Sequence, residues 1–524
     1  MFDGMRAQRV APLLVALSGG AVLLAPNEPR LLALTGFIGL LALCEALERV
    51  SADTGRSGIL RAARCGLVFG TAANACALFS LIELLGSFAR LPAVLAALLA
   101  LLAWLAQGLV FALAAGLSHY LHQAGSPRWL TLPSALMLSL GSVPALFPWH
   151  VAATQVGFLP FVQLAELGGE SLVGLLLCVA ACSLHALLRA TGSSRYRLAA
   201  VAAAAVVLPV CYGLVRLQQV RQLRAQAPTL QVGVVQSNVG MAQKHSEASA
   251  RDNLQGLRSL TRQLEARGVE LTVWAETAYP YPLLRSAVRA PEDIRRVLGD
   301  GVHGPVLLGL ETYDGFEDTF STWNSAWLVR RDGSFGARVD KTQLLPFGEY
   351  IPFWDWLPSI KTRFARRGFT HGVPGTIETE RGKLGVLICY EDLFASSARA
   401  TVLLGARALL NLTNDAWFGD SREPLLHDQL ARLRSIELRR DLVRAVNTGV
   451  SSFTSATGEV LLQTRTFERA SFAAAVRLLD EQTLYARFGD WPLVGCLLTL
   501  GICALWRRRS GPLASARASG SSAD

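Results

Sequence analysis

The chain lacks several features on which common protein classes depend. Only four of its 50 basic residues are lysines, and it has eight histidines, none of which lies in a sequence context typical of a cysteine–histidine protease site. No segment repeats at a fixed period, which argues against a repeat architecture. The N-terminal apolar run has no small-residue cleavage site, so we expect a retained membrane helix and not a removed signal peptide.

Composition predicts a membrane part joined to one soluble domain. Hydrophobic residues make up 51% of the chain and the mean hydropathy is +0.34, which is too apolar for an ordinary soluble enzyme. The net charge of +10 comes from arginines that lie mainly between apolar runs and beyond the last one. This placement favours membrane topology over nucleic-acid binding.

Eight apolar runs approach the roughly 20 residues that cross a bilayer, and the arginines between them orient the chain by the positive-inside rule. Only Arg30 and Arg90 fall in short outer loops, so we expect Leu230–Gly489 to lie outside the cytoplasmic membrane, although Arg216, Arg221 and Arg224 argue mildly against this. The expected spans are Ala11–Pro26, Leu31–Ala46, Cys65–Leu85, Leu91–Leu117, Leu130–Phe147, Ser171–Leu188, Leu198–Val215 and Trp491–Trp506.

After Thr229 short strands alternate with helices, and hairpins are inserted, which predicts a two-layer α/β sandwich. The expected strands are Leu230–Val239, Leu271–Ala275, Val306–Leu310, Ser325–Val329, Ser334–Val339, Leu384–Cys389, Ala408–Leu412, Leu442–Val446, Ser451–Thr454 and Glu459–Thr464, with helices at Ser246–Arg267, Ser396–Leu404 and Leu425–Arg440. We therefore divide the chain into a membrane domain (1–225), a catalytic domain (226–488), a final transmembrane helix (489–509) and a disordered tail (510–524).

Acidic residues in the apolar part are candidates for function because a charge at bilayer depth is costly. Glu83 lies within an apolar run, and Glu166 and Glu170 border another. Residues 147–171 form an irregular stretch, which we interpret as an outer loop or re-entrant segment near the mouth of the site.

Cys389 is the only one of nine cysteines that lies in the soluble part. A lone thiol makes no disulfide within its domain and is a poor zinc site. It is therefore either a buried structural thiol or a nucleophile. It follows the apolar run Gly385–Ile388 directly, and α/β folds keep reacting groups at the carboxyl ends of such strands.

Two further residues could activate this thiol, which is a weak nucleophile at neutral pH. Glu276 ends a predicted strand, and the ends of parallel strands meet at one sheet edge, so its carboxylate could take the thiol proton. Lys341 persists where arginine otherwise dominates, and a compact ammonium suits a tetrahedral oxyanion better than a guanidinium does. Each could instead be an ordinary surface charge.

Four motifs together resemble a known family. Trp274–Pro280, Asp340–Tyr350 and Ile388–Glu391 are similar to the glutamate, lysine and cysteine motifs of the nitrilase (carbon–nitrogen hydrolase) superfamily, and Asn414–Ser421 follows at the expected place. With the flanking membrane runs and Phe147–Trp149, the chain resembles the bacterial apolipoprotein N-acyltransferase family. The resemblance implies a polytopic α-helical membrane domain and an extracytoplasmic nitrilase-like α-β-β-α sandwich.

The resemblance also implies roles for individual residues. Glu276 would be the general base, Lys341 the oxyanion stabiliser and Cys389 the nucleophile. Glu349, Tyr390 and Glu391 would support them, and Asn414, Trp417, Phe418, Trp354 and Trp356 would line the substrate pocket. The residues themselves leave two interpretations of the cluster Phe353, Trp354, Trp356 and Leu357, which follows the lysine motif: a loop that dips into the headgroup region, or ordinary core residues.

The implied reaction passes an acyl chain from a phospholipid to Cys389 and then to the α-amino group of a diacylglyceryl apolipoprotein. No metal, cofactor, nucleic acid or partner subunit is expected, and the enzyme would act as a monomer in the bacterial inner membrane. The chain departs from the family pattern at His245, where an aromatic residue is usual, and before Phe147, where an acidic-aromatic-arginine run is missing. A membrane-tethered amidase, a non-catalytic lipid- or lipoprotein-binding paralogue and a transporter using Glu83 are the alternatives.

Overall fold

The computed structural model of the 524-residue chain describes residues 2–87, 91–240, 243, 247–315, 320–346, 348–350 and 368–518. Contacts divide the chain into two units. Unit 1 comprises Met1–Leu217 and Phe488–Asp524, and unit 2 comprises Gln218–Arg487.

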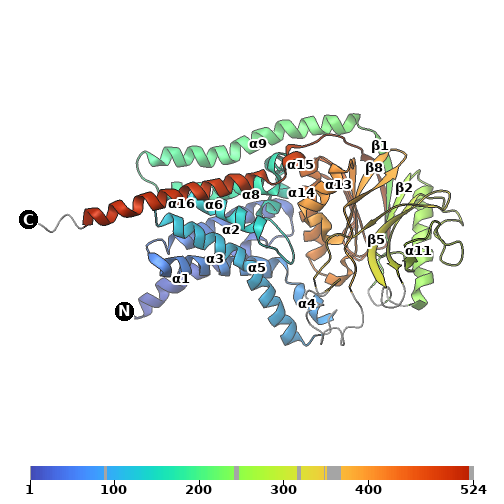
Figure 1. The fold of residues 1–524 in the computed structure, drawn as a ribbon, viewed down its shortest axis with the longest axis horizontal. Helices are drawn as coiled ribbons and strands as arrows, with labels where there is room; N and C mark the ends of the chain where they lie inside the picture. The colour runs from blue at the N-terminus through green and yellow to red at the C-terminus, as the bar shows by residue number, and fades with distance from the viewer. Residues whose placement is uncertain are drawn as a thin grey trace, which may run out of the picture. The chain divides into compact units, whose positions relative to one another are not determined.

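Unit 1 is helical throughout its described elements (Figure 1). Its helices are α1 (Phe2–Leu23), α2 (Pro29–Glu48), α3 (Gly55–Ala77), α4 (Leu81–Ser87), α5 (Ala93–His122), α6 (Arg128–Ser142), η1 (Val151–Gly157), α7 (Leu159–Val162), α8 (Ala165–Arg189), α9 (Ser194–Gln226, which continues into unit 2) and α16 (Trp491–Ala518). α16 extends past Arg509, the predicted end of the last helix.

Within the described residues, four helices are long and apolar enough to cross a membrane, namely α2, α5, α8 and α9. Two shorter apolar helical segments are Val10–Leu23 and Trp491–Trp506. Apolar runs were expected at all six places. The prediction of a polytopic helical part is confirmed.

Two predicted spans differ from the structure. Cys65–Leu85 is not one helix, because α3 begins ten residues earlier, at Gly55, and ends at Ala77 before the separate α4. The run to Phe147 is also too long, because α6 ends at Ser142 and Pro144 follows its C-cap Val143.

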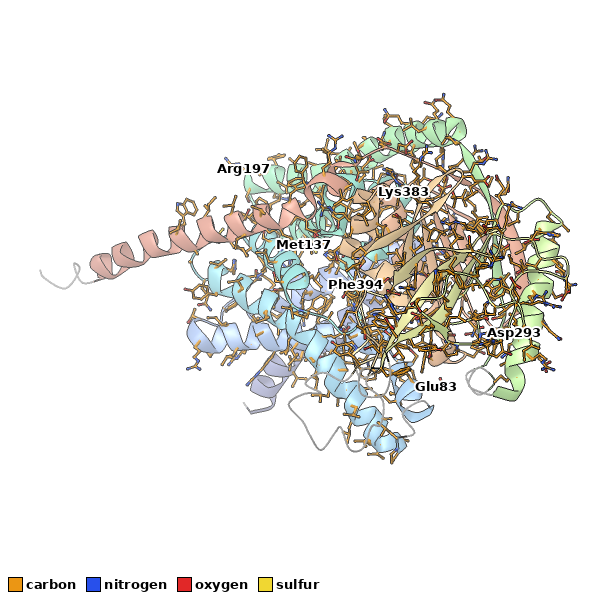
Figure 2. The ribbon with its side chains drawn as sticks, turned by 45° about the vertical axis from the view of Figure 1, so that its right-hand side comes forward. Glu83, Met137, Arg197, Asp293, Lys383 and Phe394 are labelled. Atoms are coloured by element: carbon orange, nitrogen blue, oxygen red, sulfur yellow. The ribbon has the colours of Figure 1, made fainter. Side chains whose placement is uncertain are left out.

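The acidic residues of unit 1 have different environments. Glu83 is exposed on α4, where Figure 2 labels it. Glu166 is buried at the start of α8 and accepts hydrogen bonds from α9: Arg216 Nε and Nη2 donate at 2.6 and 3.0 Å, and the Tyr212 hydroxyl donates at 2.5 Å. The Glu166 charge is therefore paired, and it ties α8 to α9.

Unit 2 contains two β-sheets with helices on their outer faces (Figure 1), which confirms the predicted α-β-β-α sandwich. The first sheet has the strand order β13-β1-β2-β4-β5-β6, with β3 paired to β4. Its strands are β1 (Thr229–Gln236), β2 (Leu271–Trp274), β3 (Leu283–Leu284), β4 (Val306–Asp314), β5 (Ser321–Val329), β6 (Phe335–Asp340) and β13 (Ala470–Arg477).

The second sheet has the order β12-β11-β10-β9-β8-β7, and β8, β9 and β10 run parallel. Its strands are β7 (Gly375–Thr379), β8 (Gly382–Ile388), β9 (Ala408–Thr413), β10 (Leu442–Val446), β11 (Ser452–Thr454) and β12 (Val460–Gln463). β3, β7 and β13 were not predicted. β13 pairs antiparallel with β1 from Thr229↔Arg477 to Gln236↔Ala470.

The core of unit 2 has three layers of apolar contact. Valines and leucines of both sheets, among them Val273 and Val386, pack against each other in the centre. On one outer face, α11 (Glu247–Glu265) buries Leu254, Leu257 and Leu264, which confirms the helical leucine spacing. On the other face lie α13 (Ala395–Leu403) and α14 (Glu423–Leu438).

Candidate active site

Cys389 directly follows β8 and is the first residue of the short 3-10 helix η4 (Cys389–Leu393), so it lies at a sharp turn of the chain. Its φ is +57°, a conformation that non-glycine residues rarely adopt and that often marks a functional site. Asn411 of β9 fixes this turn, because its Nδ2 donates to the Cys389 carbonyl oxygen at 2.7 Å. Figure 2 labels Lys383, near the start of β8, and Phe394, the residue that follows η4.

Glu276 follows β2 and is only 5% exposed. Thr277, the next residue, has a φ of +45°, and β4 approaches so closely that a Cβ on Gly309 would lie 2.1 Å from the Ala275 carbonyl oxygen. Asn324 Nδ2 donates to Glu276 Oε1 at 2.7 Å, and the Asn414 backbone N–H donates to Oε2 at 2.9 Å. Both carboxylate oxygens are therefore held by donors.

Lys341 follows β6, is 2% exposed and lies between two carboxylates. Its Nζ is 3.2 Å from Glu276 Oε1 and 2.8 Å from Glu349 Oε1. Asn324 Nδ2 also donates to Glu349 Oε1 at 3.2 Å, and the Leu345 N–H donates to Glu349 Oε2 at 2.8 Å. One buried ammonium is thus shared by two fixed acids.

The charges of this cluster set the protonation of the thiol and the amine. Burial alone would lower the pKa of Lys341, but the Cys389 sulfur when ionised and the carboxylates of Glu276 and Glu349 raise it well above its ordinary value, so the ammonium is retained. Burial raises the pKa of the Cys389 thiol well above its usual range, and Glu276 adds to this while Lys341 opposes it. The resting thiol is therefore neutral and needs a base to become a nucleophile.

The two sheets supply different members of the site. Glu276 and Lys341 follow strands of the first sheet, whereas Cys389 and Asn414 follow strands of the second. The expectation that Glu276 and Cys389 meet along the edge of one parallel sheet is wrong. They belong to facing sheets, which places the acid and the thiol on opposite walls of the site.

Glu391 joins two parts of the chain: the residues that follow Lys341 (Thr342 and Gln343, here called the lysine segment) and the turn at Cys389 (here called the nucleophile turn). Its Oε1 accepts from the Thr342 N–H at 2.5 Å, the Thr342 hydroxyl at 2.6 Å and the Gln343 N–H at 2.9 Å, and its Oε2 accepts from the Ile388 N–H at 2.8 Å. Burial raises the pKa of Glu391, although these hydrogen bonds favour the ionised form. The residues on either side of the site are therefore cross-linked through one buried carboxyl group.

Tyr390 and the predicted pocket residues surround this centre. The Tyr390 ring lies under the Lys341 ammonium, 5.4 Å from Nζ to the ring centroid. The Asn414 side chain is buried and accepts from Asn447 Nδ2 at 3.0 Å. Trp417 and Phe418 are half-buried on the 3-10 helix η5 (Asp415–Phe418). The remaining predicted pocket and loop residues lie outside the described part of the chain: Phe353, Trp354, Trp356, Leu357 and His245.

Two parts of the site were not predicted from the sequence. Asn324 donates to the carboxylates of Glu276 and Glu349, but it lies one residue before the predicted strand Ser325–Val329. The observed strand β5 begins at Ser321 and includes it, and a polar residue on the inward face of this longer strand was the available signal. The second is a set of buried charges around His427, of which only Asp415 falls in one of the recognised motifs. Among the described residues, no group of three or more His, Cys, Asp or Glu side chains is arranged to hold a metal ion.

An α-β-β-α sandwich in which buried Glu and Lys residues and a half-buried Cys residue meet at strand ends defines a carbon–nitrogen hydrolase domain of the nitrilase superfamily. The family model described as carbon-nitrogen hydrolase matches residues 231–484, and the model described as the apolipoprotein N-acyltransferase N-terminal domain matches residues 18–183. The chain belongs to the apolipoprotein N-acyltransferase family of multi-pass membrane enzymes, so the resemblance noted in the sequence is confirmed.

Similar proteins include two apolipoprotein N-acyltransferases. The protein from Gloeobacter violaceus is 34% identical over 386 residues, covering 70% of this chain and 69% of that protein. The protein from Geobacter metallireducens is 29% identical over 518 residues, covering 95% of this chain and 96% of that protein. The solved structure of Saccharomyces cerevisiae Nit3, a nitrilase-superfamily member, covers 51% of this chain and 95% of its own, with a TM-score of 0.36 and 19% identity.

Proposed function

We propose that this chain transfers an acyl group from a phospholipid to the α-amino group of the diacylglyceryl-cysteine at the N-terminus of apolipoproteins, through a thioester on Cys389. The observation that carries the proposal is the Lys341 ammonium, which contacts both Glu276 and Glu349 beside the only thiol of unit 2. Membership of the family and the apolar helices of unit 1 support lipid-anchored substrates.

In the first half-reaction, Glu276 accepts the thiol proton and the Cys389 sulfur attacks the sn-1 ester carbonyl of the phospholipid. Negative charge develops on the carbonyl oxygen, and the Lys341 ammonium and the Tyr390 backbone N–H stabilise it. When the C–O bond breaks, the lysophospholipid alkoxide takes the proton from Glu276. The products are a lysophospholipid with a free sn-1 hydroxyl and an S-acyl cysteine.

In the second half-reaction, the neutral α-amino group of the lipoprotein attacks the thioester carbonyl. Glu276 accepts one amine proton, the C–S bond breaks, and the Cys389 thiolate then recovers the proton. The products are an N-acylated lipoprotein and the free enzyme. We place this reaction on the outer side of the cytoplasmic membrane, because arginines are concentrated in the opposite set of loops, and we assign it to a single copy of the chain.

Intact-mass spectrometry of the purified full-length protein tests both halves. Incubation with a phospholipid of defined acyl chains is expected to add the mass of one acyl group, which hydroxylamine removes and Cys389→Ala abolishes. Cys211→Ala, at an exposed cysteine of α9, is the matched control and is expected to acylate normally. A lipopeptide bearing N-terminal diacylglyceryl-cysteine should discharge the adduct, whereas its N-acetylated form should not. A folded protein with an alkylatable Cys389 but no adduct from any phospholipid would overturn the proposal.

A further inference from the structure

A group of buried charges, here called the charge cluster, lies beside the nucleophile turn. Two of its members contact one imidazole ring: His427 Nε2 is 2.8 Å from Asp392 Oδ1, and His427 Nδ1 is 3.2 Å from Asp415 Oδ1. Every side chain of the cluster is at most 10% exposed. Its members are Asp392, Asp415, His427, Asp428, Arg432 and Arg444.

The ring of His427 connects the two turns that carry the reacting groups. Asp392 lies three residues after Cys389 in η4, and Asp415 begins η5 directly after Asn414. The Asn414 N–H in turn donates to Glu276 Oε2 at 2.9 Å. A single side chain of α14 therefore links the turn of the nucleophile to the turn that holds the predicted base.

The geometry favours a doubly protonated ring. Each ring nitrogen faces a carboxylate oxygen, and a neutral imidazole has only one N–H to donate. Burial would lower the pKa of His427, but Asp392 and Asp415 outweigh burial and Arg444 and raise it to about 9. His427 is therefore an imidazolium at neutral pH.

The cluster is then electrically balanced. Three carboxylates (Asp392, Asp415 and Asp428) face three cations, since Arg444 contacts Asp392 and lies 3.8 Å from Asp428, and Arg432 lies 2.6 Å from Asp428. A neutral residue at 427 would leave one negative charge uncompensated close to the thiol. Burial, Glu276, Glu349 and Asp415 already raise the pKa of Cys389, against the opposing effect of Lys341.

We propose that His427 is a positioning residue for the acyl transfer proposed above: its imidazolium holds the nucleophile turn and the Asn414–Asp415 turn together and cancels carboxylate charge that opposes thiolate formation at Cys389. Asp415 is tightly packed against Gly449, because a Cβ on Gly449 would lie 2.2 Å from Asp415 Oδ2. The turn after Asn414 therefore has little freedom to rearrange when the ring loses its charge.

The test is the pH dependence of Cys389 alkylation by iodoacetamide in the full-length protein, quantified on the Cys389 peptide by mass spectrometry. His427→Gln is expected to raise the midpoint of alkylation by about one pH unit, and to slow acyl-adduct formation from phospholipid at least tenfold. His303→Gln, at an exposed histidine of unit 2, is the control and is expected to match the native protein.

Asp415→Asn distinguishes charge from packing. In the native background it is expected to lower the midpoint, and combined with His427→Gln it is expected to return the midpoint to near the native value. An unchanged midpoint in both His427→Gln and Asp415→Asn would overturn the proposal. If His427→Gln does not fold, Asp415→Asn alone decides, and an unshifted midpoint refutes the electrostatic role. Alkylation of Cys389 needs no phospholipid, so it tests the role of His427 separately from acyl transfer. If the variants shift the alkylation midpoint but the native protein forms no acyl adduct, the acyl-transfer proposal is refuted and the electrostatic role of His427 stands.

Discussion

Replacing Glu391 by glutamine tests whether one buried carboxyl group sets the distance between the lysine segment and the nucleophile. The native carboxylate accepts from the Thr342 N–H and hydroxyl and the Gln343 N–H on Oε1, and from the Ile388 N–H on Oε2. An amide has one acceptor oxygen. The best orientation of the glutamine amide keeps its oxygen on the three donors of Thr342 and Gln343. Its NH2 group then faces the Ile388 N–H, which loses its acceptor.

The size of the effect follows from these contacts. Leaving the buried Ile388 N–H without an acceptor costs about 1–3 kcal/mol, and the three remaining bonds lose their charge-assisted character. In a domain of this size about 1 kcal/mol corresponds to roughly 2–4 °C in Tm. We therefore expect Glu391→Gln to lower the Tm of unit 2 by about 2–12 °C. Because the bonds on both sides weaken, acyl-adduct formation should also slow at least tenfold.

Thermal unfolding followed by intrinsic fluorescence, together with the intact-mass assay, measures both quantities on one preparation. Glu380→Gln is the matched control, because Glu380 is exposed in the β7–β8 connection and should tolerate the same change. If Glu391→Gln unfolded within about 1 °C of the native protein and formed the adduct at the native rate, Glu391 would not hold the lysine segment in place.

Three further changes have defined outcomes. Lys341→Arg keeps the positive charge but replaces the compact ammonium by a planar guanidinium at a position that is only 2% exposed, and we expect the rate of adduct formation to fall about 10²–10³-fold. A rate within threefold of native would show that the charge alone suffices. Asn324→Leu removes the donor shared by Glu276 and Glu349, and a loss of about 10–100-fold in adduct rate is expected; an unchanged rate would make Asn324 a packing residue. Because the pKa of His427 is about 9 when folded and about 6.5 when unfolded, its stabilisation is complete below pH 6.5 and is lost as the pH rises through 9, by about 3 kcal/mol. The Tm of the native protein should therefore approach that of His427→Gln over this range, and parallel curves would contradict the assignment.

Local signals made much of unit 2 predictable. The leucine spacing of α11 and the apolar runs of β8, β9 and β10 depend on neighbours in the chain, and each was recognised close to its observed bounds. Cys389 stood out because it is a lone thiol at the end of a strand. Lys341 stood out because lysine is rare here. In both cases the residue type and its local sequence were enough to predict a catalytic role, without knowledge of the residues that contact it in the fold.

Other features depend on contacts between distant segments. β13 alternates weakly in sequence, and it is a strand because β1, about 240 residues earlier, supplies its partner. Asn324 and His427 have no motif, and their importance lies in carboxylates contributed by other elements. The same limit explains the two misjudged spans of unit 1, since hydropathy alone did not locate the start of α3 or the stop at Pro144.

The pairing of β1 with β13 has a consequence for how the protein is made. Eight consecutive residues of β1, from Thr229 to Gln236, have as their partners on one side only the segment Ala470–Arg477. During synthesis from the N-terminus this edge of β1 stays open until almost the whole unit has emerged, so unit 2 closes late and as a whole. A nascent chain that stalls before Ala470 presents an unpaired valine-rich edge, the kind of surface that recruits chaperones or aggregates. The first sheet is therefore completed only when β13 becomes available to pair with β1.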